Sequence, residues 1–317
     1  MRSLVNLLFR REKKTFSPPR IYYLFLALRP QQWVKNLFLF APLLFALEFN
    51  NFTALFRTLI AFVLFTAAAS GVYLLNDYFD LEQDRLHPKK KNRPLAAGKI
   101  SIPLAWTTSI FLLSSSLILS FLWSPALAAV IFIYISVNIL YSRGLKEMVI
   151  VDAMSFSLFF ILRLLAGALV NKILLSHWII ICTGLLSLLI AFGKRYQELK
   201  HLGRKAAAHR QVLGKYSANF LEQLMTITVT SLIVAYTLYT VDQRTVHFFG
   251  SPILLLTVPF VYYGVFRYLY NVYELQRGAE PVEILFQDRK MQLALLFWIL
   301  SVIIGLYFLR QSVPWLT

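Results

Sequence analysis

The chain has 317 residues, of which 58% are hydrophobic and 15% charged, and its 32 Lys and Arg against 15 Asp and Glu give a formal charge of +17. A soluble domain is about 45–50% apolar, so this composition excludes a soluble globule, and the single cysteine, Cys182, excludes a disulfide framework or a multi-cysteine metal site. On such a chain, positive charge indicates contact with anionic lipid or an anionic substrate rather than with nucleic acid.

The first predicted element is a basic N-terminal segment, residues 1–35, that precedes the membrane spans. Its apolar run, residues 4–9, is too short for the core of a signal peptide and is followed at once by basic residues. The run predicts either a short helix that lies on an anionic leaflet or a disordered basic tail.

Nine stretches that follow are candidates for membrane-spanning helices, which need about 20 mostly apolar residues. They cover residues 37–52, 54–75, 103–123, 126–141, 149–170, 176–192, 224–241, 252–270 and 293–308. The first is short and gives the weakest signal, whereas the fourth has a clear start at Ser124-Pro125. Since no linker or repeat interrupts the pattern, the sequence predicts one all-α, polytopic membrane domain over residues 1–317.

The basic residues orient these spans. With a cytoplasmic N-terminus, 26 of the 32 Lys and Arg fall on the cytoplasmic side, 4 on the other side, and the rest within spans. Such an asymmetry is typical of the positive-inside rule. We therefore expect a multi-pass protein of the cell (inner or plasma) membrane whose N-terminus is cytoplasmic and whose C-terminus is outside.

The cytoplasmic end of the second span carries three acids with helical spacing. Asp77, Asp80 and Asp84 stand at i, i+3 and i+7, so on a continuous helix they share an arc of about 60°. Carboxylates on one stripe repel each other unless a cation binds them, and hard oxygen ligands suit Mg²⁺. Asn76 precedes them inside the apolar zone, where a polar group is costly. The alternative is a solvated helix end with three acids by chance.

A basic segment, residues 87–98, follows the acids directly. Acids and then bases on one loop predict a Mg²⁺–phosphate ligand, with the metal on the acids and phosphate oxygens on the bases. Arg93 is the favoured phosphate contact, since the proline after it restricts its backbone. The lysines at positions 89–91 suit topology and lipid charge equally well.

The fourth and fifth spans add isolated polar groups. The short turn of residues 141–146 carries two bases, which suit phosphate binding or topology alone. Asp152 and Arg163 lie on one face of the fifth span, where charge is costly in hydrocarbon. A structural ion-pair network and substrate contact are equally good explanations of these two residues.

The sixth span ends on a second polar motif, residues 193–199, which carries one acid and two bases. Lys194 and Arg195 stand at helical contact spacing from Glu198. The last cytoplasmic loop carries further charges that suit either the site or an ordinary loop: Arg277, Glu280, Asp288 and Arg289.

Through NDxxDxxxD at residues 76–84 and RPLAAG at residues 93–98, the chain resembles the UbiA superfamily of intramembrane prenyltransferases. Within it, the chain is similar to the decaprenyl-phosphate phosphoribosyltransferase branch. The similarity rests on residues 29–36, the SGVYLLND run from Ser70, GKRYxEL from Gly193, and Glu280-Pro281 with Asp288-Arg289. The resemblance spans most of the chain and implies a UbiA-like bundle of about nine helices.

The resemblance implies Mg²⁺-dependent transfer of 5-phosphoribosyl from phosphoribosyl pyrophosphate to a polyprenyl (decaprenyl-type) phosphate, with release of diphosphate. It implies that the catalytic acids hold Mg²⁺ and diphosphate with a supporting amide: Asp77, Asp80, Asp84 and Asn76. It implies further substrate contacts, mostly to phosphate: Arg85, Lys89, Arg93, Tyr141, Lys146, Lys194 and Arg195. Glu198 would bind ribose hydroxyls or orient Lys194, and Arg163 would meet the lipid phosphate.

Two other functions stay open. Ordinary UbiA enzymes use two acid-rich motifs to ionise a prenyl diphosphate, whereas this chain has one acid, Glu198, in the second motif. This single acid counts against prenyl transfer to an aromatic acceptor such as 4-hydroxybenzoate, which is the alternative reaction. A transporter or flippase that uses the acids as a cation site is the other. The sequence leaves the length of the lipid and the oligomeric state open.

Overall fold

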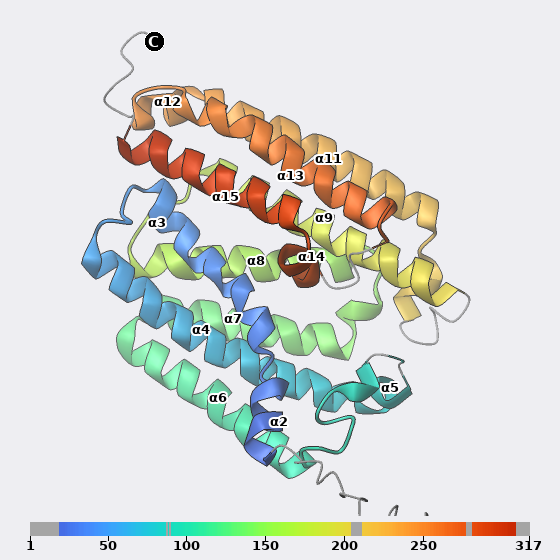
Figure 1. The fold of residues 1–317 in the computed structure, drawn as a ribbon. Coiled ribbons are helices and arrows are strands. Elements are labelled where there is room, and N and C mark those ends of the chain that lie inside the picture. The colour runs from blue at the N-terminus through green and yellow to red at the C-terminus, as the bar shows by residue number, and fades with distance from the viewer. Residues whose placement is uncertain (1–18, 87, 89, 204–210, 277–280, 309–317) are drawn as a thin grey trace, which may run out of the picture.

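The computed structural model describes residues 19–86, 88, 90–203, 211–276 and 281–308. In this part of the chain the regular structure is helical, without strands (Figure 1). Eight helical segments are long and apolar enough to span a membrane. They are α4 (Phe52–Phe79), α6 (Ile102–Trp123), α7 (Pro125–Arg143), α8 (Val151–Val170), α9 (His177–Leu202), α11 (Ala218–Val241), η6 with α13 (Ile253–Thr257 and Val258–Tyr273) and α15 with η7 (Arg289–Ile303 and Ile304–Phe308).

These eight segments coincide with the second to ninth predicted spans, which confirms an all-α, polytopic membrane protein. Serine residues are the N-caps of four of these helices. Each serine hydroxyl accepts a hydrogen bond from a backbone N–H of the first turn, which stabilises the start of the helix. The four caps are Ser101, Ser124, Ser176 and Ser217, at oxygen–nitrogen distances of 3.4, 3.4, 3.2 and 3.1 Å. The predicted start of α7 at Ser124-Pro125 is therefore confirmed.

The first predicted span, residues 37–52, is not one continuous helix. The chain forms a 3₁₀-helix, η1 (Pro30–Phe40), then α3 (Ala41–Phe45), and turns before α4. Pro42 lacks the N–H that would continue an α-helical ladder across the junction. At about 2.0 Å per residue in η1 and about 1.5 Å in α3, the two pieces reach about 30 Å, the thickness of the hydrocarbon core. The broken segment is long enough for a ninth crossing.

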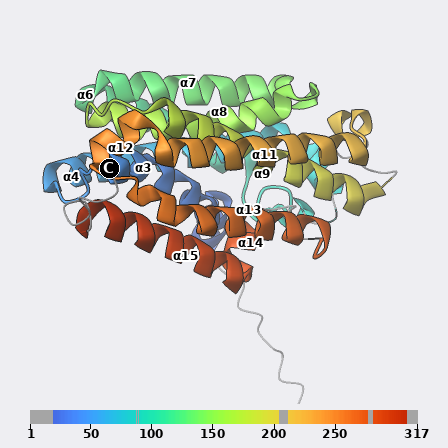
Figure 2. The ribbon, with the colours of Figure 1, turned by 90° about the horizontal axis from the view of Figure 1, so that it is seen from above.

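The core consists of two helix groups that share α8. One buried cluster joins η1, α4, α7 and α8 around Phe65 and Tyr134, and the other joins α8, α9, α11 and α13 around Leu189 and Met225. Figures 1 and 2 show α6 and α7 on one side of the molecule and α13 and α15 on the other. The outer helix α6 exposes large apolar side chains such as Phe111 and Leu122, as expected for a surface that faces lipid.

A close contact fixes the broken segment against α8. A Cβ atom on Gly167 would lie 1.9 Å from the backbone oxygen of Leu39, so only glycine lets α8 and η1 approach this closely. One turn earlier, Arg163 donates from Nε to Asn36 Oδ1 at 2.7 Å and from Nη1 to the Phe159 carbonyl at 2.7 Å. Arg163 is 2% exposed, so it packs η1 onto α8 deep in the bundle.

Shorter elements complete the described structure and connect the long helices. They are α2 (Arg20–Ala27), α5 (Leu81–Leu86), η2 (Lys90–Asn92), η3 (Leu145–Glu147), η5 (Gln211–Lys215), α12 (Gln243–Phe249) and α14 (Pro281–Gln287). Of these, α5, η2 and η3 lie at the end of the bundle where the polar residues gather.

Candidate active site

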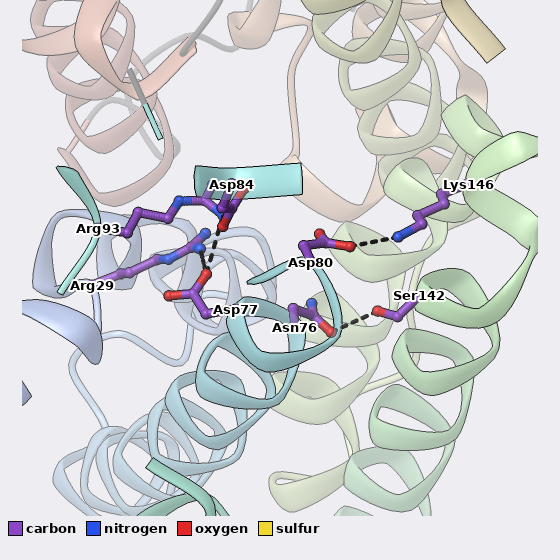
Figure 3. A network of polar contacts seen from close by, with 8 residues as sticks. All are labelled: Arg29, Asn76, Asp77, Asp80, Asp84, Arg93, Ser142 and Lys146. Carbon is purple, nitrogen blue, oxygen red and sulfur yellow. Dashed lines mark hydrogen bonds and ion pairs between the residues drawn. The ribbon is translucent and has the colours of Figure 1, made fainter. Parts of the chain in front are cut away.

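The three predicted acids lie where α4 ends, but they do not share one helix face. The helix stops at Phe79, Asp80 is its C-cap with φ −95° and ψ 8°, and α5 begins a new axis at Leu81. Figure 3 shows the result: Asp77 and Asp84 face each other across one guanidinium, whereas Asp80 points to the opposite side. The expectation of a common stripe is wrong, because the i, i+3, i+7 rule holds only for an unbroken helix.

Three basic side chains neutralise the three acids. Asp77 forms ion pairs with Arg29 and Arg93, and Arg93 Nη1 also lies 2.5 Å from Asp84 Oδ2. Lys146 Nζ lies 2.5 Å from Asp80 Oδ1. Since Asp77 and Asp84 are both 2% exposed, such partners are required for them to stay ionised.

Burial acts against the charge of Asp84. It raises the pKa of Asp84 above its usual range, although the nearby guanidinium of Arg93 lowers it in part. A further cation beside Asp84 would stabilise its ionised form and so oppose the effect of burial on its pKa.

The same geometry permits a metal ion. Arg93 Nη1 lies between the two carboxylates, 3.1 Å from Asp77 Oδ1 and 2.5 Å from Asp84 Oδ2, so it marks a position where a cation has two oxygen ligands. Within the described ranges, no three acidic, His or Cys side chains are grouped to hold a metal by themselves. One or two carboxylates completed by water and phosphate oxygens are the usual protein ligands of Mg²⁺. The pair therefore fits Mg²⁺ bound together with a phosphate ligand.

The C-terminal end of α7 and the following η3 lie beside the three acids. Ser142 donates a hydrogen bond from Oγ to Asn76 Oδ1 at 2.6 Å, and Lys146 follows on η3 (Figure 3). The amide of Asn76 is thus fixed beside the acids and holds the end of α4 against α7.

A second polar group lies at the same end, between α8 and α9. Arg195 is 2% exposed and donates to Asp152 Oδ2 from Nε and to Glu198 Oε2 from Nη1, both at 2.6 Å. Its Nη2 donates to Tyr141 Oη at 3.4 Å. Of the two explanations for Asp152, the ion-pair network agrees with these contacts, and its partner is Arg195 rather than Arg163.

Tyr216 supports this network from the other side. Its hydroxyl donates to Asp152 Oδ1 at 2.8 Å and accepts from the backbone N–H of Ile150 at 2.7 Å. Ile150 has a φ of 69°, which is strained for a β-branched residue. The hydrogen bond to Tyr216 therefore helps to hold the strained turn that leads into α8, just before Asp152.

Lys90 connects the two polar groups. Burial lowers the pKa of Lys90, and the positive charges of Arg93 and Lys194 lower it further, whereas Glu198 and Asp84 act in the opposite direction. η2 packs against α5, and the charges of Lys194 and Glu198 on α9 are near enough to act on Lys90. We call the group around Asp77, Asp80 and Asp84 the first half of the site, and the group around Asp152, Arg195 and Glu198 the second half. Lys90 and Lys194 add positive charge to the second half.

Other predicted site residues lie elsewhere. Arg85 is exposed and pairs with the exposed Glu82 at 3.4 Å, and Arg163 packs deep in the bundle. Asp288 caps α15 and binds Arg267 at 2.9 Å. Lys89, Arg277 and Glu280 lie outside the described residues.

Sequence reasoning missed four residues of the site: Arg29, Lys90, Ser142 and Tyr216. Arg29 has a visible signal, since it is a cation directly before a proline in the segment that precedes the first predicted span. The others reach the site through contacts between distant parts of the chain, which no local pattern shows.

Comparisons with known proteins show what the chain is similar to. Residues 37–287 match the model of the UbiA prenyltransferase family. The chain is 36% identical over 280 residues to the decaprenyl-phosphate phosphoribosyltransferase of Mycobacterium tuberculosis, which covers 87% of this chain and 91% of the relative. It is 36% identical over 287 residues to the enzyme of that name from Corynebacterium glutamicum, covering 89% of this chain and 86% of the relative. A solved UbiA homologue from Archaeoglobus fulgidus bound to GPP and Mg²⁺ shares the fold, with a TM-score of 0.67 and 15% identity over 90% of this chain and 99% of that one.

Proposed function

The chain belongs to the UbiA prenyltransferase family, and we propose that it transfers a 5-phosphoribosyl group from phosphoribosyl pyrophosphate to a polyprenyl phosphate. An oxygen of the lipid phosphate forms a bond to the anomeric carbon of the ribose. The bond from that carbon to diphosphate breaks, and the electron pair leaves with the diphosphate. The relatives named decaprenyl-phosphate phosphoribosyltransferase, 36% identical over most of the chain, support this reaction.

The charge of the second half of the site is the observation that carries the proposal. The acids supplied by α8 and α9, Asp152 and Glu198, bind two different nitrogens of Arg195, Nε and Nη1, so they do not share a single cation position as Asp77 and Asp84 do. Lys90 and Lys194 are near enough to interact electrostatically with each other, and Lys90 with Glu198, so that together with Arg195 three cations face two acids in this half. A donor with a second phosphate, remote from its diphosphate, needs such cations. Phosphoribosyl pyrophosphate has that phosphate on its 5-carbon.

The first half suits the diphosphate of the donor. We assign Asp77 and Asp84 as ligands of Mg²⁺, at the position that Arg93 Nη1 marks between them. A bound Mg²⁺ would stabilise the negative charge that develops on the leaving diphosphate. The presence of Mg²⁺ in the solved Archaeoglobus homologue is consistent with this assignment.

The bases of the first half then exchange partners when the donor binds. Arg29 and Arg93, which now neutralise Asp77, turn to phosphate oxygens, and their planar guanidinium groups match such oxygens in pairs. Each carboxylate keeps a cationic neighbour throughout, so no buried charge is left unpaired. Lys146 stays close enough to act on Asp80 or on a phosphate.

The remaining polar residues position this machinery. Arg195 holds Glu198 and the Tyr141 hydroxyl in place through hydrogen bonds, and Ser142 orients the amide of Asn76. The lipid phosphate is already ionised, so its oxygen needs no strong general base. We propose that this end of the bundle faces the cytoplasm, because the excess of Lys and Arg lies on its side.

A transfer assay tests the proposal. Purified protein in detergent is given Mg²⁺, phosphoribosyl pyrophosphate labelled in the ribose, and a polyprenyl phosphate. We expect labelled lipid that is lost with EDTA and with Asp77→Asn but retained with Glu82→Gln, which removes an exposed acid of the same segment. Absence of labelled lipid, together with consumption of a prenyl diphosphate when 4-hydroxybenzoate is supplied, would instead establish prenyl transfer.

A further inference from the structure

The helix α8 begins without a side-chain cap, unlike most of the other long helices. Six of the eight spanning segments begin with a Ser, Asn or Asp side chain that accepts a backbone N–H. The N-cap residue of α8 is Ile150, which makes no such bond. Asp152 lies in the first turn, but its two carboxylate oxygens bind Tyr216 and Arg195. The start of α8 is therefore held by contacts with other segments of the chain.

Tyr216 reaches this turn from η5, which it follows directly in sequence. Lys215 Nζ donates to the Glu147 carbonyl at 3.3 Å, and the N–H of Ile150 donates to Tyr216 Oη at 2.7 Å. The segment η3 carries Lys146 of the first half of the site, and α8 begins the second half. The end of η5 and Tyr216 therefore hold the link between the two halves at two points.

The hydroxyl of Tyr216 has one hydrogen, and its two contacts fix the direction of that hydrogen. The backbone N–H of Ile150 can only donate, so it occupies an acceptor position on Oη. The hydroxyl hydrogen is then donated to Asp152 Oδ1, with an oxygen–oxygen distance of 2.8 Å. Tyr216 is 5% exposed, and burial raises its pKa above the ordinary value of 10, so the hydroxyl keeps this proton.

The contact with Ile150 also holds a strained backbone. Ile150 has a φ of 69° and a ψ of −45°, a conformation that a β-branched residue rarely adopts. Such strain persists only where the surroundings hold it, and it concentrates at functional sites. Loss of the Tyr216 hydroxyl would let this turn relax. Relaxation would shift Asp152, two residues further on, and with it the guanidinium of Arg195.

We propose that Tyr216 is a positioning residue for the phosphoribosyl donor. Its hydroxyl holds Asp152, and Asp152 holds Arg195. Arg195 in turn orients Glu198 in the second half of the site. This inference rests on the proposed function and adds to it the residue that sets where the second half lies relative to the first. A donor with a phosphate and a diphosphate spans both halves, so it depends on this distance.

Kinetics with Tyr216→Phe test the assignment, because phenylalanine keeps the ring and removes the hydroxyl. We expect the KM for phosphoribosyl pyrophosphate to rise about tenfold, the scale typical of removing a group that orients a binding residue. Inorganic diphosphate fits the first half alone, so its Ki against the donor should stay within about twofold of the wild-type value. A similar rise in the donor KM and in the Ki of diphosphate would show a general loss of structure and overturn the positioning role.

Tyr236→Phe is the matched control, since it removes another buried tyrosine hydroxyl. Tyr236 is 6% exposed, its Oη lies 2.6 Å from Thr257 Oγ1, and it accepts from Trp298 Nε1 at 2.8 Å. It stands about 27 Å along α11 from Ala218, the first residue of that helix after Tyr216. We expect both substitutions to lower the Tm in detergent, but Tyr236→Phe should leave the donor KM within about twofold of wild type. Equal donor KM values in the two variants would overturn the assignment.

The substitution Asp152→Asn tests the route by which Tyr216 acts. It removes the charge that binds Arg195, so alone it should raise the donor KM and leave the Ki of diphosphate unchanged. In this background, Tyr216→Phe should change the donor KM less than about twofold. A full tenfold effect there, or an unchanged donor KM in Asp152→Asn alone, would overturn the route through Asp152. If the wild-type protein makes no phosphoribosyl lipid at all, it is the proposed function that fails.

Discussion

At the scale of single residues, we propose that the site depends most on Asp77. It is 2% exposed and forms ion pairs with two arginines. Asp77→Asn keeps the size of the side chain but removes its charge, so we expect turnover to fall at least about 100-fold. Glu82→Gln, an exposed acid in the same segment, should leave turnover unchanged. Turnover within twofold of wild type in Asp77→Asn, measured in the presence of Mg²⁺, contradicts the assigned role.

Lys90 and Lys91 are adjacent in sequence but differ in surroundings. Lys90 is partly buried beside Glu198 and Asp84, whereas Lys91 is exposed. We expect Lys90→Met to raise the KM for phosphoribosyl pyrophosphate about tenfold through the loss of a phosphate contact. Lys91→Met should leave this KM unchanged. Equal effects of both substitutions would show that only the net charge of the loop matters.

We expect the same lysine to make donor binding depend on pH. Burial, together with the charges of Arg93 and Lys194, lowers the pKa of Lys90 below its ordinary 10.5. As the pH rises through this lowered pKa, Lys90 loses its proton and its attraction for phosphate, so the KM for phosphoribosyl pyrophosphate should rise on the alkaline side. Lys90→Arg should move that rise to higher pH, because arginine stays protonated. A profile that is identical in Lys90→Arg would assign the rise to another group.

At the scale of elements, hydropathy predicted eight long helices because each one is apolar over enough residues to cross the membrane. The same signal could not show that residues 30–45 form a 3₁₀-helix and a short α-helix, since the break depends on Pro42 and on contacts with α8. The acid motif was found as a local pattern. The α4 helix ends before Asp80, and this acid pairs with Lys146, 66 residues away, which no local pattern shows.

The contact between η1 and α8 makes Gly167 a sensitive position. Gly167→Ala would place a methyl group 1.9 Å from the backbone oxygen of Leu39, and the backbone cannot yield as a flexible side chain would. We expect a loss of about 1–3 kcal/mol of stability, measured as a lower Tm in detergent. Gly264→Ala is the control, since nothing lies within 4 Å of its added methyl group. A Tm for Gly167→Ala equal to that of Gly264→Ala would mean that η1 is not packed as described.

At the scale of the whole molecule, one end of the bundle gathers the acids, their basic partners and most of the cationic loops. The orientation can be tested with single cysteines in a Cys182→Ala background. Lys91→Cys lies at the site end, and Leu174→Cys lies in the exposed turn between α8 and α9. In intact cells, a membrane-impermeant maleimide should label position 174 and not position 91. The reverse pattern would place the site outside the cell.

The most direct measurement offers both donors to one preparation. Purified protein with Mg²⁺ receives ¹⁴C-labelled phosphoribosyl pyrophosphate and ³H-labelled geranyl diphosphate, with a polyprenyl phosphate and 4-hydroxybenzoate as acceptors. A site with one acid half and one basic half predicts ¹⁴C in the lipid phosphate product, its loss with EDTA, and no ³H in either acceptor. Transfer of ³H to 4-hydroxybenzoate without ¹⁴C in the lipid would contradict the account, because Lys90 and Lys194 would then serve a donor that has no phosphate apart from its diphosphate.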